Sequence, residues 1–300
     1  MIFKRIFTIF MLLYCGKIFT VIAAESEHLG KVQRPLKVAK GKLAISNFKH
    51  EHILWHNILK KNVKMSTDRS SSTIDYKSIN RQKLDLYIAN ALAISNEQFK
   101  KWSKNQKLSY YINLYNALTV KKILAAYPVK SIKDLHSGFP FYTSPWKIKF
   151  FKLFGEDSHL DHIEHTLVRA SGEFNDPRIH FAFNCASIGC PALVDEAFVA
   201  AKLDLQLETA LKHFLKDKKR NYFDVGKNKL ILSKIFQWYR QDFEKGHRGF
   251  TSLEKFLSLY SQFIYGLSKK NSAQLILEKK IGIDFQEYNW NLNDIQKIKK

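Results

Sequence analysis

The chain has 300 residues, of which 45% are hydrophobic and 25% are charged. This composition is typical of a globular protein and excludes a fibrous or a disordered chain. Three cysteines are too few for a scaffold built on disulfides, and alone they do not form a zinc site. The 49 Lys and Arg residues outnumber the 27 Asp and Glu residues, so the net charge is +22 and the surface favours anionic partners.

The start of the chain differs from the rest. It has a short basic region, an apolar run over residues 6–14 and two alanines just before Glu25. This order predicts a cleavable signal peptide over residues 1–24 and a periplasmic or secreted protein. Lys17 interrupts the apolar stretch, and an uncleaved membrane anchor over residues 6–24 is the alternative. Cleavage after Ala24 would leave a net charge of about +19.

The remaining sequence indicates one domain. Residues 25–47 show no hydrophobic period and predict a flexible basic arm, and residues 293–300 form a basic tail. We expect residues 48–292 to fold as a single α+β domain, mainly helical around a small β-sheet. The cations are scattered, without clustered arginines and interleaved aromatics, so no specific nucleic acid partner is expected. An anionic envelope polymer or lipid remains a candidate partner.

Hydrophobic spacing predicts most of the secondary structure. A helix over residues 106–127 should end at Pro128, and a capping box at Ser95 indicates a helix start. Alternation predicts strands at 146–154 and 178–183. Further predictions are helices at 160–170, 196–216, 233–243, 252–265 and 272–278, and a hairpin over residues 222–232.

The stretch 178–191 carries the most chemical information. A strand over 178–183 would place His180 and Asn184 on one face, and the following loop contains Cys185 and Cys190. Three hypotheses compete for the two cysteines: a structural disulfide, a reversible redox pair, and a nucleophilic thiolate at Cys185 activated by a histidine.

Two further groups of polar residues accompany this loop. Asn113 and Asn116 lie three residues apart in an apolar helix, where their amides either clamp a neighbouring loop or bind substrate. In the predicted helix 160–170, helical spacing aligns Asp161, His165 and Arg169, with Glu164 beside them. This row could orient a general base or form surface ion pairs. We expect no metal site because the segment lacks a His-Glu-x-x-His arrangement, and we expect no cofactor.

These residues occur in motifs that resemble the uncharacterised "domain of unknown function 547" family. The motifs follow the family's order over about residues 48–292. The resemblance implies an autonomous mixed α/β unit with its site at the polar motif residues, and the family has no assigned reaction. The sequence departs from the family pattern at Gly189, where a serine is expected. The motifs are Trp55–Leu59, Ile74–Tyr76, Tyr111–Thr119, Tyr127–Asp134, Ile163–His165 with Arg169, Asp176–Phe181, Asn184–Ser187 with Cys190-Pro191, Ile235–Tyr239 with Asp242-Phe243, and Tyr288–Trp290.

The leading functional hypothesis is a thiol-dependent hydrolase or acyl transferase that acts on a small-molecule or peptide substrate. Cys185 would be the nucleophile, His180 or His165 the base, and Glu164 the group that orients the base. The alternatives are a non-enzymatic basic module that binds the envelope and has a structural disulfide, and a thiol–disulfide exchange protein. The residues expected to bind substrate or stabilise an oxyanion are Asn113, Asn116, Asn184, Ser187 and Arg169.

Overall fold

The computed structural model describes residues 48–136, 143–268 and 270–298. The expected signal peptide and basic arm lie outside these ranges. Within the described ranges, every helix is too short or too polar to span a bilayer. The fold is mainly helical with small sheets, at 50% helix and 12% strand, which confirms the α+β class.

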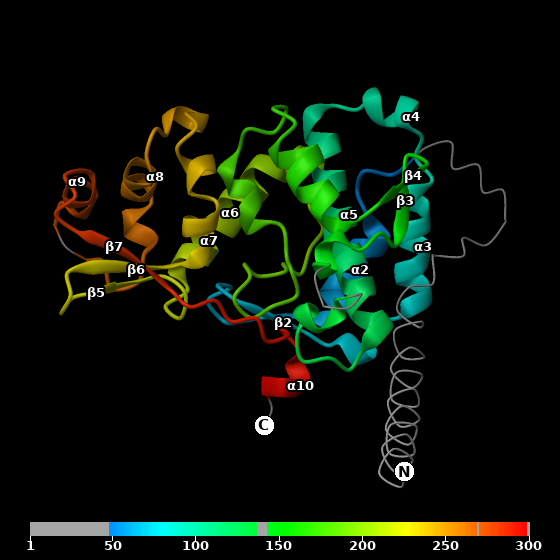
Figure 1. Cartoon of the computed structure of the whole chain (residues 1–300), viewed down its shortest axis with the longest axis horizontal. Helices are drawn as coiled ribbons and strands as arrows, with labels where there is room; N and C mark the ends of the chain where they lie inside the picture. The colour runs from blue at the N-terminus through cyan, green and yellow to red at the C-terminus, as the bar shows by residue number, and fades with distance from the viewer. Residues whose placement is uncertain (1–47, 137–142, 269, 299–300) are drawn as a thin grey trace, which may run out of the picture.

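The N-terminal half is a helical layer built around one long helix (Figure 1). α2 (Ile53–Asn62), α3 (Arg81–Leu92) and α4 (Asn96–Lys100) surround α5 (Lys104–Ala126). α5 begins at a capping box formed by Ser103 and Gln106, and the predicted capping box at Ser95 is also present. These boxes satisfy backbone N–H groups that the first helical turn leaves unpaired. The central part of α5 is buried on every side, so its polar residues must find partners inside the protein.

The described residues form three small sheets, whereas the sequence suggested a single one. Two are antiparallel pairs, and the third is β5-β6-β7. The hairpin of β5 and β6 confirms the sequence prediction, whereas the parallel pairing of β7 with β6 was not predicted. The strands are β1 (Val63–Met65), β2 (Ser72–Ile74), β3 (Phe151–Leu153), β4 (Glu156–Ser158), β5 (Tyr222–Asp224), β6 (Lys229–Ser233) and β7 (Gly282–Gln286).

The C-terminal half forms a second hydrophobic cluster, which lies beside the first. Its helices surround the β5-β6-β7 sheet, and the chain then returns from β7 across the molecule toward α10 (Figure 1). On this return the segment pairs with the N-terminal half, where Leu292 bridges to Ser187 and Asp294 to Ile74. The helices of this half are α6 (Leu203–Lys216), α7 (Lys234–Trp238), α8 (Leu253–Leu259), α9 (Ser272–Leu277) and α10 (Ile295–Ile298).

The predicted strand over 178–183 is wrong. The segment is a 3₁₀ helix, η5 (Pro177–Phe181), with proline in its first turn and the Asp176 side chain accepting from the backbone of Arg178. The alternating apolar residues have another cause: Ile179 packs in the first hydrophobic cluster and Phe181 in the second. A short helix between two clusters therefore mimics the pattern of a strand.

The segment 146–154 also differs from its prediction. Only β3 is extended, and a 3₁₀ turn, η3 (Pro145–Lys147), precedes it. The predicted helix 160–170 is present, but it is a π-helix, η4 (His162–Arg169), in which Ala170 N–H donates to the His165 carbonyl. Such wide turns are rare and occur frequently at functional sites.

Candidate functional site

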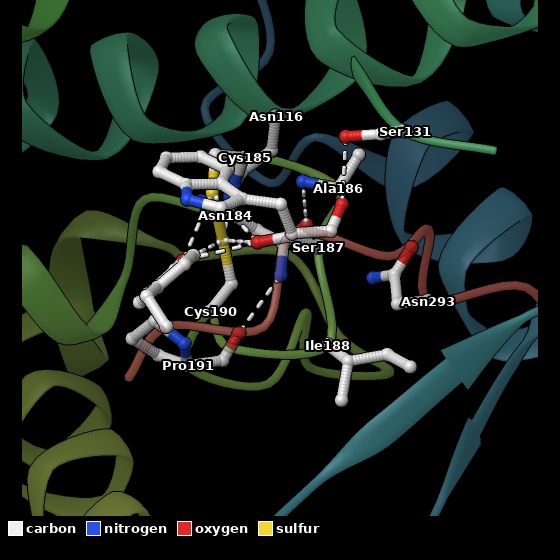
Figure 2. Close-up of a disulfide and its surroundings, with 12 residues drawn as sticks. Asn116, Ser131, Asn184, Cys185, Ala186, Ser187, Ile188, Cys190, Pro191 and Asn293 are labelled. Atoms are coloured by element: carbon white, nitrogen blue, oxygen red, sulfur yellow. Dashed lines mark hydrogen bonds between the residues drawn. A yellow bond between two sulfur atoms is a disulfide. The ribbon is translucent and has the colours of Figure 1, made fainter. Parts of the chain in front are cut away.

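Side-chain amides hold the cysteine-bearing loop against α5 (Figure 2). Asn116 on α5 donates to the Ala182 carbonyl and accepts from the Asn184 N–H, both at 2.9 Å. The Asn184 side chain donates to the Pro191 carbonyl at 2.8 Å and accepts from the Ala186 N–H at 2.9 Å. Both amides are buried and have partners on donor and acceptor sides. Together they fix the loop between the two hydrophobic clusters.

Cys185 and Cys190 form a disulfide within this loop, with their Cα atoms 6.2 Å apart. The two sulfurs have different surroundings, because Cys190 is buried and Cys185 is partly exposed. The Cys190 sulfur is approached by the backbone N–H of Cys185 at 2.9 Å, the hydroxyl of Tyr288 at 3.1 Å and the hydroxyl of Ser187 at 3.3 Å. Both hydroxyls also lie 3.2 Å from the Cys185 sulfur.

Gly189 allows the Tyr288 ring to lie over the loop. A Cβ atom at position 189 would be 2.9 Å from three atoms of that ring, closer than real Cβ contacts allow. Burial raises the pKa of the Tyr288 phenol, so its hydroxyl stays protonated and can donate to sulfur. The glycine that departs from the expected family pattern thus has a structural reason.

The disulfide borders a cavity of about 260 Å³. The π-helix η4 contributes Glu164 and His165, and η5 contributes His180. Most of the remaining lining is aromatic and comes from widely separated segments of the chain. The aromatic residues are Tyr115, Trp146, Phe183, Trp238, Tyr239, Tyr288 and Trp290.

His180 is paired with Asp242, and this pairing defines its tautomer. Its Nε2 lies 2.7 Å from Oδ2 of Asp242, and the side chain is 1% exposed. Because a carboxylate accepts, Nε2 carries the hydrogen and Nδ1 keeps a lone pair. That Nδ1 atom is buried and makes no hydrogen bond with the described residues. The ring also stacks on Tyr239, with centroids 3.9 Å apart.

Electrostatics keep this pair as a neutral imidazole and a charged carboxylate. Burial lowers the pKa of His180, although Asp242 opposes the shift. Burial alone would raise the pKa of Asp242, but hydrogen bonds from His180 and Arg169 hold it below its ordinary value. Arg169 Nε donates to Asp242 at 2.6 Å. A neutral imidazole with a free lone pair is the form required of a general base.

His165 has the opposite arrangement. Arg169 Nη1 lies 3.0 Å from Nδ1 of His165. A guanidinium can only donate, so Nδ1 accepts and the hydrogen of a neutral ring is on Nε2, 3.8 Å from Asp161. The predicted row of Asp161, His165 and Arg169 exists. In this row Nδ1 of His165 already accepts from Arg169, so a neutral His165 offers only an Nε2–H donor and no free lone pair.

Glu164 is a buried carboxylate that is 8% exposed. The hydroxyl of Tyr239 donates to it at 3.2 Å, and the hydroxyl of Tyr115 is also hydrogen-bonded to it. It forms no ion pair with the described residues. Glu164 therefore places a carboxylate at the cavity whose hydrogen bonds come from phenol hydroxyls, and the Arg169 guanidinium attracts it electrostatically without a direct ion pair. It does not contact His180 through a hydrogen bond; Asp242 holds that ring instead.

The structure brings together some of the residues that the sequence singled out. Cys185, Cys190, Glu164, His165 and His180 all line the cavity. The others lie around it or away from it, with Ser187 against the sulfurs and Arg169 behind His165. Asn113 does not contact the cysteine-bearing loop through these bonds. Its side chain accepts from the backbone N–H of Phe198 at 3.0 Å and donates to the Phe198 carbonyl at 2.7 Å. No described histidine nitrogen is hydrogen-bonded to either sulfur.

Sequence reasoning missed several residues of the site. The cavity-lining residues Trp238, Tyr239, Tyr288 and Trp290, and Asp242, which pairs with His180, lie in or beside the motifs at 235–243 and 288–290, which the sequence analysis noted without giving them a role. One signal could have indicated a role for Asp242: it is an acidic residue in a segment rich in aromatic residues, 236–243. Among the described residues no group of three or more His, Cys, Asp or Glu side chains could hold a metal ion.

One family model matches part of the chain. Residues 99–215 match the family described as "Protein of unknown function, DUF547". This segment is a DUF547 domain. The match confirms the resemblance within these residues, and the motifs at 55–76 and beyond residue 215 lie outside it. Comparisons with curated proteins and with solved structures found no match.

The DUF547 segment supplies the disulfide, His180 and Glu164, but not the whole cavity. Asp242 and Tyr239 come from the following 3₁₀ turn and α7 region, and Tyr288 and Trp290 come from the returning C-terminal segment. The site described here therefore needs residues on both sides of the end of the matched segment.

Proposed function

We propose that the protein is a thiol-dependent acyl hydrolase or acyl transferase in which Cys185 is the nucleophile and His180 the base. One observation carries this proposal: the partly exposed Cys185 and an Asp242-oriented His180 with an unused Nδ1 lone pair line the same cavity. A nucleophile, a base and a group that orients the base are the parts of nucleophilic catalysis.

The disulfide must open before Cys185 can act. An external dithiol reduces the bridge: it becomes a disulfide, and Cys185 and Cys190 become thiols. The Cys185 proton then passes to Nδ1 of His180, and the thiolate adds to the carbonyl carbon of an ester, thioester or amide. Reduction also frees the side-chain rotation of Cys185, which the bridge restricts. Apo geometry without a direct sulfur–imidazole hydrogen bond is compatible with such a role.

The second half of the reaction completes the balance. The leaving alcohol, thiol or amine takes the proton from His180, and the acyl group stays on Cys185 as a thioester. Water, or an acceptor nucleophile, then attacks the thioester while His180 accepts its proton, and Cys185 leaves as the thiolate. The hydroxyls of Tyr288 and Ser187 supply donors beside the reacting sulfur. Asn116 and Asn184 hold the cysteine-bearing loop and Asn113 holds Phe198, so backbone groups already occupy all three amides.

Alkylation kinetics test the proposal. The protein is reduced with a dithiol, treated with iodoacetamide, and the labelling of Cys185 is followed by peptide mass. We expect Cys185 to react faster than a free cysteine near pH 7, and His180→Asn to slow it by at least about 10-fold. His162→Asn, which alters a histidine outside the cavity lining, is the matched control.

Two further measurements guard against misfolding. Asp242→Asn keeps the size of the side chain and should also slow labelling, because the imidazole loses its orientation. The pH profile of labelling in the wild type needs no variant and should show a thiolate below the usual thiol pKa. Labelling of reduced Cys185 at the rate of free cysteine, unchanged in Asp242→Asn, would refute the proposal.

A second candidate is thiol–disulfide exchange, favoured by the asymmetry of the bridge. An incoming thiolate can reach Cys185, and the departing Cys190 thiolate would keep its three donors from the Cys185 N–H, Ser187 and Tyr288. The expected result is a stable mixed disulfide on Cys185 in a Cys190→Ser variant. A reduction potential below about −300 mV, as in structural disulfides, would exclude this candidate.

A further inference from the structure

We infer that the cavity beside Cys185 binds the ammonium group of a cationic amine ligand, with Glu164 as its counter-ion and aromatic rings as its walls. The inference deepens the proposed function by naming a substrate class. Binding of the amine does not depend on that function, but its role as a substrate does.

The first observation is that the charged side chains of the cavity lining are opposite in sign to the net charge of the chain. The chain carries 49 basic and 27 acidic residues, yet no Lys or Arg is among the described residues that line this cavity. Its acidic lining groups are Asp161 and Glu164, and its two imidazoles are His165, near Asp161, and His180, buried beside Asp242. The nearest guanidinium, that of Arg169, is already bonded to Asp242 and His165. The described lining of the cavity therefore carries acidic but no Lys or Arg side chains, although Lys133 lies over the Trp290 ring and Arg169 over the Tyr239 ring.

The second observation is the kind of surface that surrounds this charge. Trp290 lies 4.5 Å from Tyr288 and 5.8 Å from Trp238, measured between ring centroids, and all three line the cavity. Aromatic faces attract cations, most strongly where water is excluded. An acidic group set among aromatic rings is thus complementary to an alkylammonium or quaternary ammonium group.

The state of Glu164 distinguishes a cation from a neutral sugar, which also stacks on tryptophan. The Glu164 carboxylate is buried, its hydrogen bonds come from phenol hydroxyls, and no direct ion pair with the described residues offsets its charge. A sugar would leave that charge uncompensated, whereas an ammonium would neutralise it. His180 also lines the cavity, and its Nδ1 is buried without a hydrogen-bond partner among the described residues.

The size of the cavity limits what enters. A volume of about 260 Å³ is below the usual range of pockets for drug-sized ligands. It suits a small amine or the amine-bearing end of a larger molecule, such as a lysine side chain. For an acyl transferase, such a group would be the acceptor or the part of the substrate that positions the carbonyl group.

The test measures binding without chemistry. The oxidised protein, which has no free Cys185 thiol, is titrated with n-butylammonium, n-butanol and glucose, and tryptophan fluorescence and calorimetry are recorded. We expect n-butylammonium to bind at least about 10-fold more tightly than n-butanol, and Glu164→Gln to abolish that preference. Glu156→Gln, at an exposed glutamate in β4, is the matched control and should bind like the wild type.

A second variant keeps the test decisive if Glu164→Gln does not fold. Trp238 is 45% exposed, so Trp238→Leu should leave the core intact and weaken binding of n-butylammonium severalfold. Equal binding of n-butylammonium and n-butanol, tighter binding of glucose, or wild-type affinity in both variants would overturn the inference. Because no thiol takes part, a failure here is separate from a failure of the alkylation test: a cavity that binds the amine while Cys185 proves unreactive would be a binding site only.

Discussion

At the scale of single residues, the site depends on close contacts that few other side chains could make. Gly189 is the clearest case, because the Tyr288 ring occupies the space that a Cβ atom would need. Through that approach the Tyr288 hydroxyl comes within 3.2 Å of both sulfurs. One missing methyl group therefore determines which donor faces the disulfide.

Gly189→Ala should displace Tyr288 and destabilise the fold by about 1–3 kcal/mol, as overpacking does in well-packed interiors. Urea unfolding measures the loss, and near-ultraviolet circular dichroism reports the moved ring. Gly226→Ala in the β5–β6 turn is the control, because its Cβ would meet only ordinary contacts. Equal stability of the two variants would contradict this account of Gly189.

A single buried histidine, His52, should make the folding stability depend on pH. His52 is 2% exposed, its Nδ1 pairs with the Tyr87 hydroxyl at 2.8 Å, and burial lowers its pKa to about 3. Between pH 6.5 and 3 the unfolded chain binds a proton at this residue and the folded chain does not. Stability should therefore fall as the pH is lowered through this window.

The contribution of His52 can be isolated by substitution. His52→Asn suits the left-handed backbone at this position and removes the titrating group. The slope of unfolding free energy against pH between 4 and 6 should decrease by up to about 1.4 kcal/mol per pH unit. Urea unfolding at several pH values gives both slopes. Identical slopes would show that His52 does not carry the effect.

At the scale of elements, α5 acts as the clamp for loops that are far away in sequence. Asn113 satisfies both the N–H and the carbonyl of Phe198, and Asn116 does the same for the cysteine-bearing loop. The sequence suggested this clamp as one of two alternatives, from two amides on one apolar helix face. The sequence could not identify Phe198 as the partner of Asn113, because the tertiary fold determines which loop packs against this face of the helix.

Asn113→Ala should destabilise the protein by about 2–4 kcal/mol, because it leaves two buried backbone groups of Phe198 without partners. Asn105→Ala, at an exposed position near the start of the same helix, should cost less than about 1 kcal/mol. Chemical denaturation followed by far-ultraviolet circular dichroism compares them. A loss in Asn113→Ala no greater than in the control would mean that solvent or a rearranged loop satisfies Phe198.

The same scale shows what sequence patterns could and could not predict. Helix α5 was predicted because its hydrophobic period ends at Pro128, and the β5–β6 hairpin because a Gly-containing turn joins two short apolar runs. The segment 178–183 was misassigned because its apolar residues contact two different clusters. For the site, Cys185, His180, His165 and Glu164, which the sequence singled out, line one cavity, and their catalytic roles stay predictions. Asp242 was not singled out, since its pairing with His180 spans 62 residues and leaves no local pattern.

At the scale of the whole molecule, the C-terminal segment returns from β7 toward α10 (Figure 1) and contacts both hydrophobic clusters. Tyr288 and Trp290 line the cavity, and Asn293 accepts from the Tyr76 hydroxyl at 2.8 Å and donates through its backbone to Ala186. Asp294 accepts from the Tyr127 hydroxyl at 2.7 Å. These contacts join the two ends of the described chain across the site.

A chain that ends at Gln286 should therefore lose more than a tail. It would lack the two aromatic walls and the buried residues Leu292, Asn293 and Asp294, and leave their partners on Tyr76 and Tyr127 exposed or unpaired. We expect a lower thermal midpoint, by at least about 8 °C, because several buried groups are lost together. A chain that ends at Gln296 keeps every one of these contacts and is the control. Equal thermal midpoints for the two chains would show that the segment is not a structural bridge. An unchanged preference of the shorter chain for n-butylammonium over n-butanol would show that the segment is not a wall of the cavity.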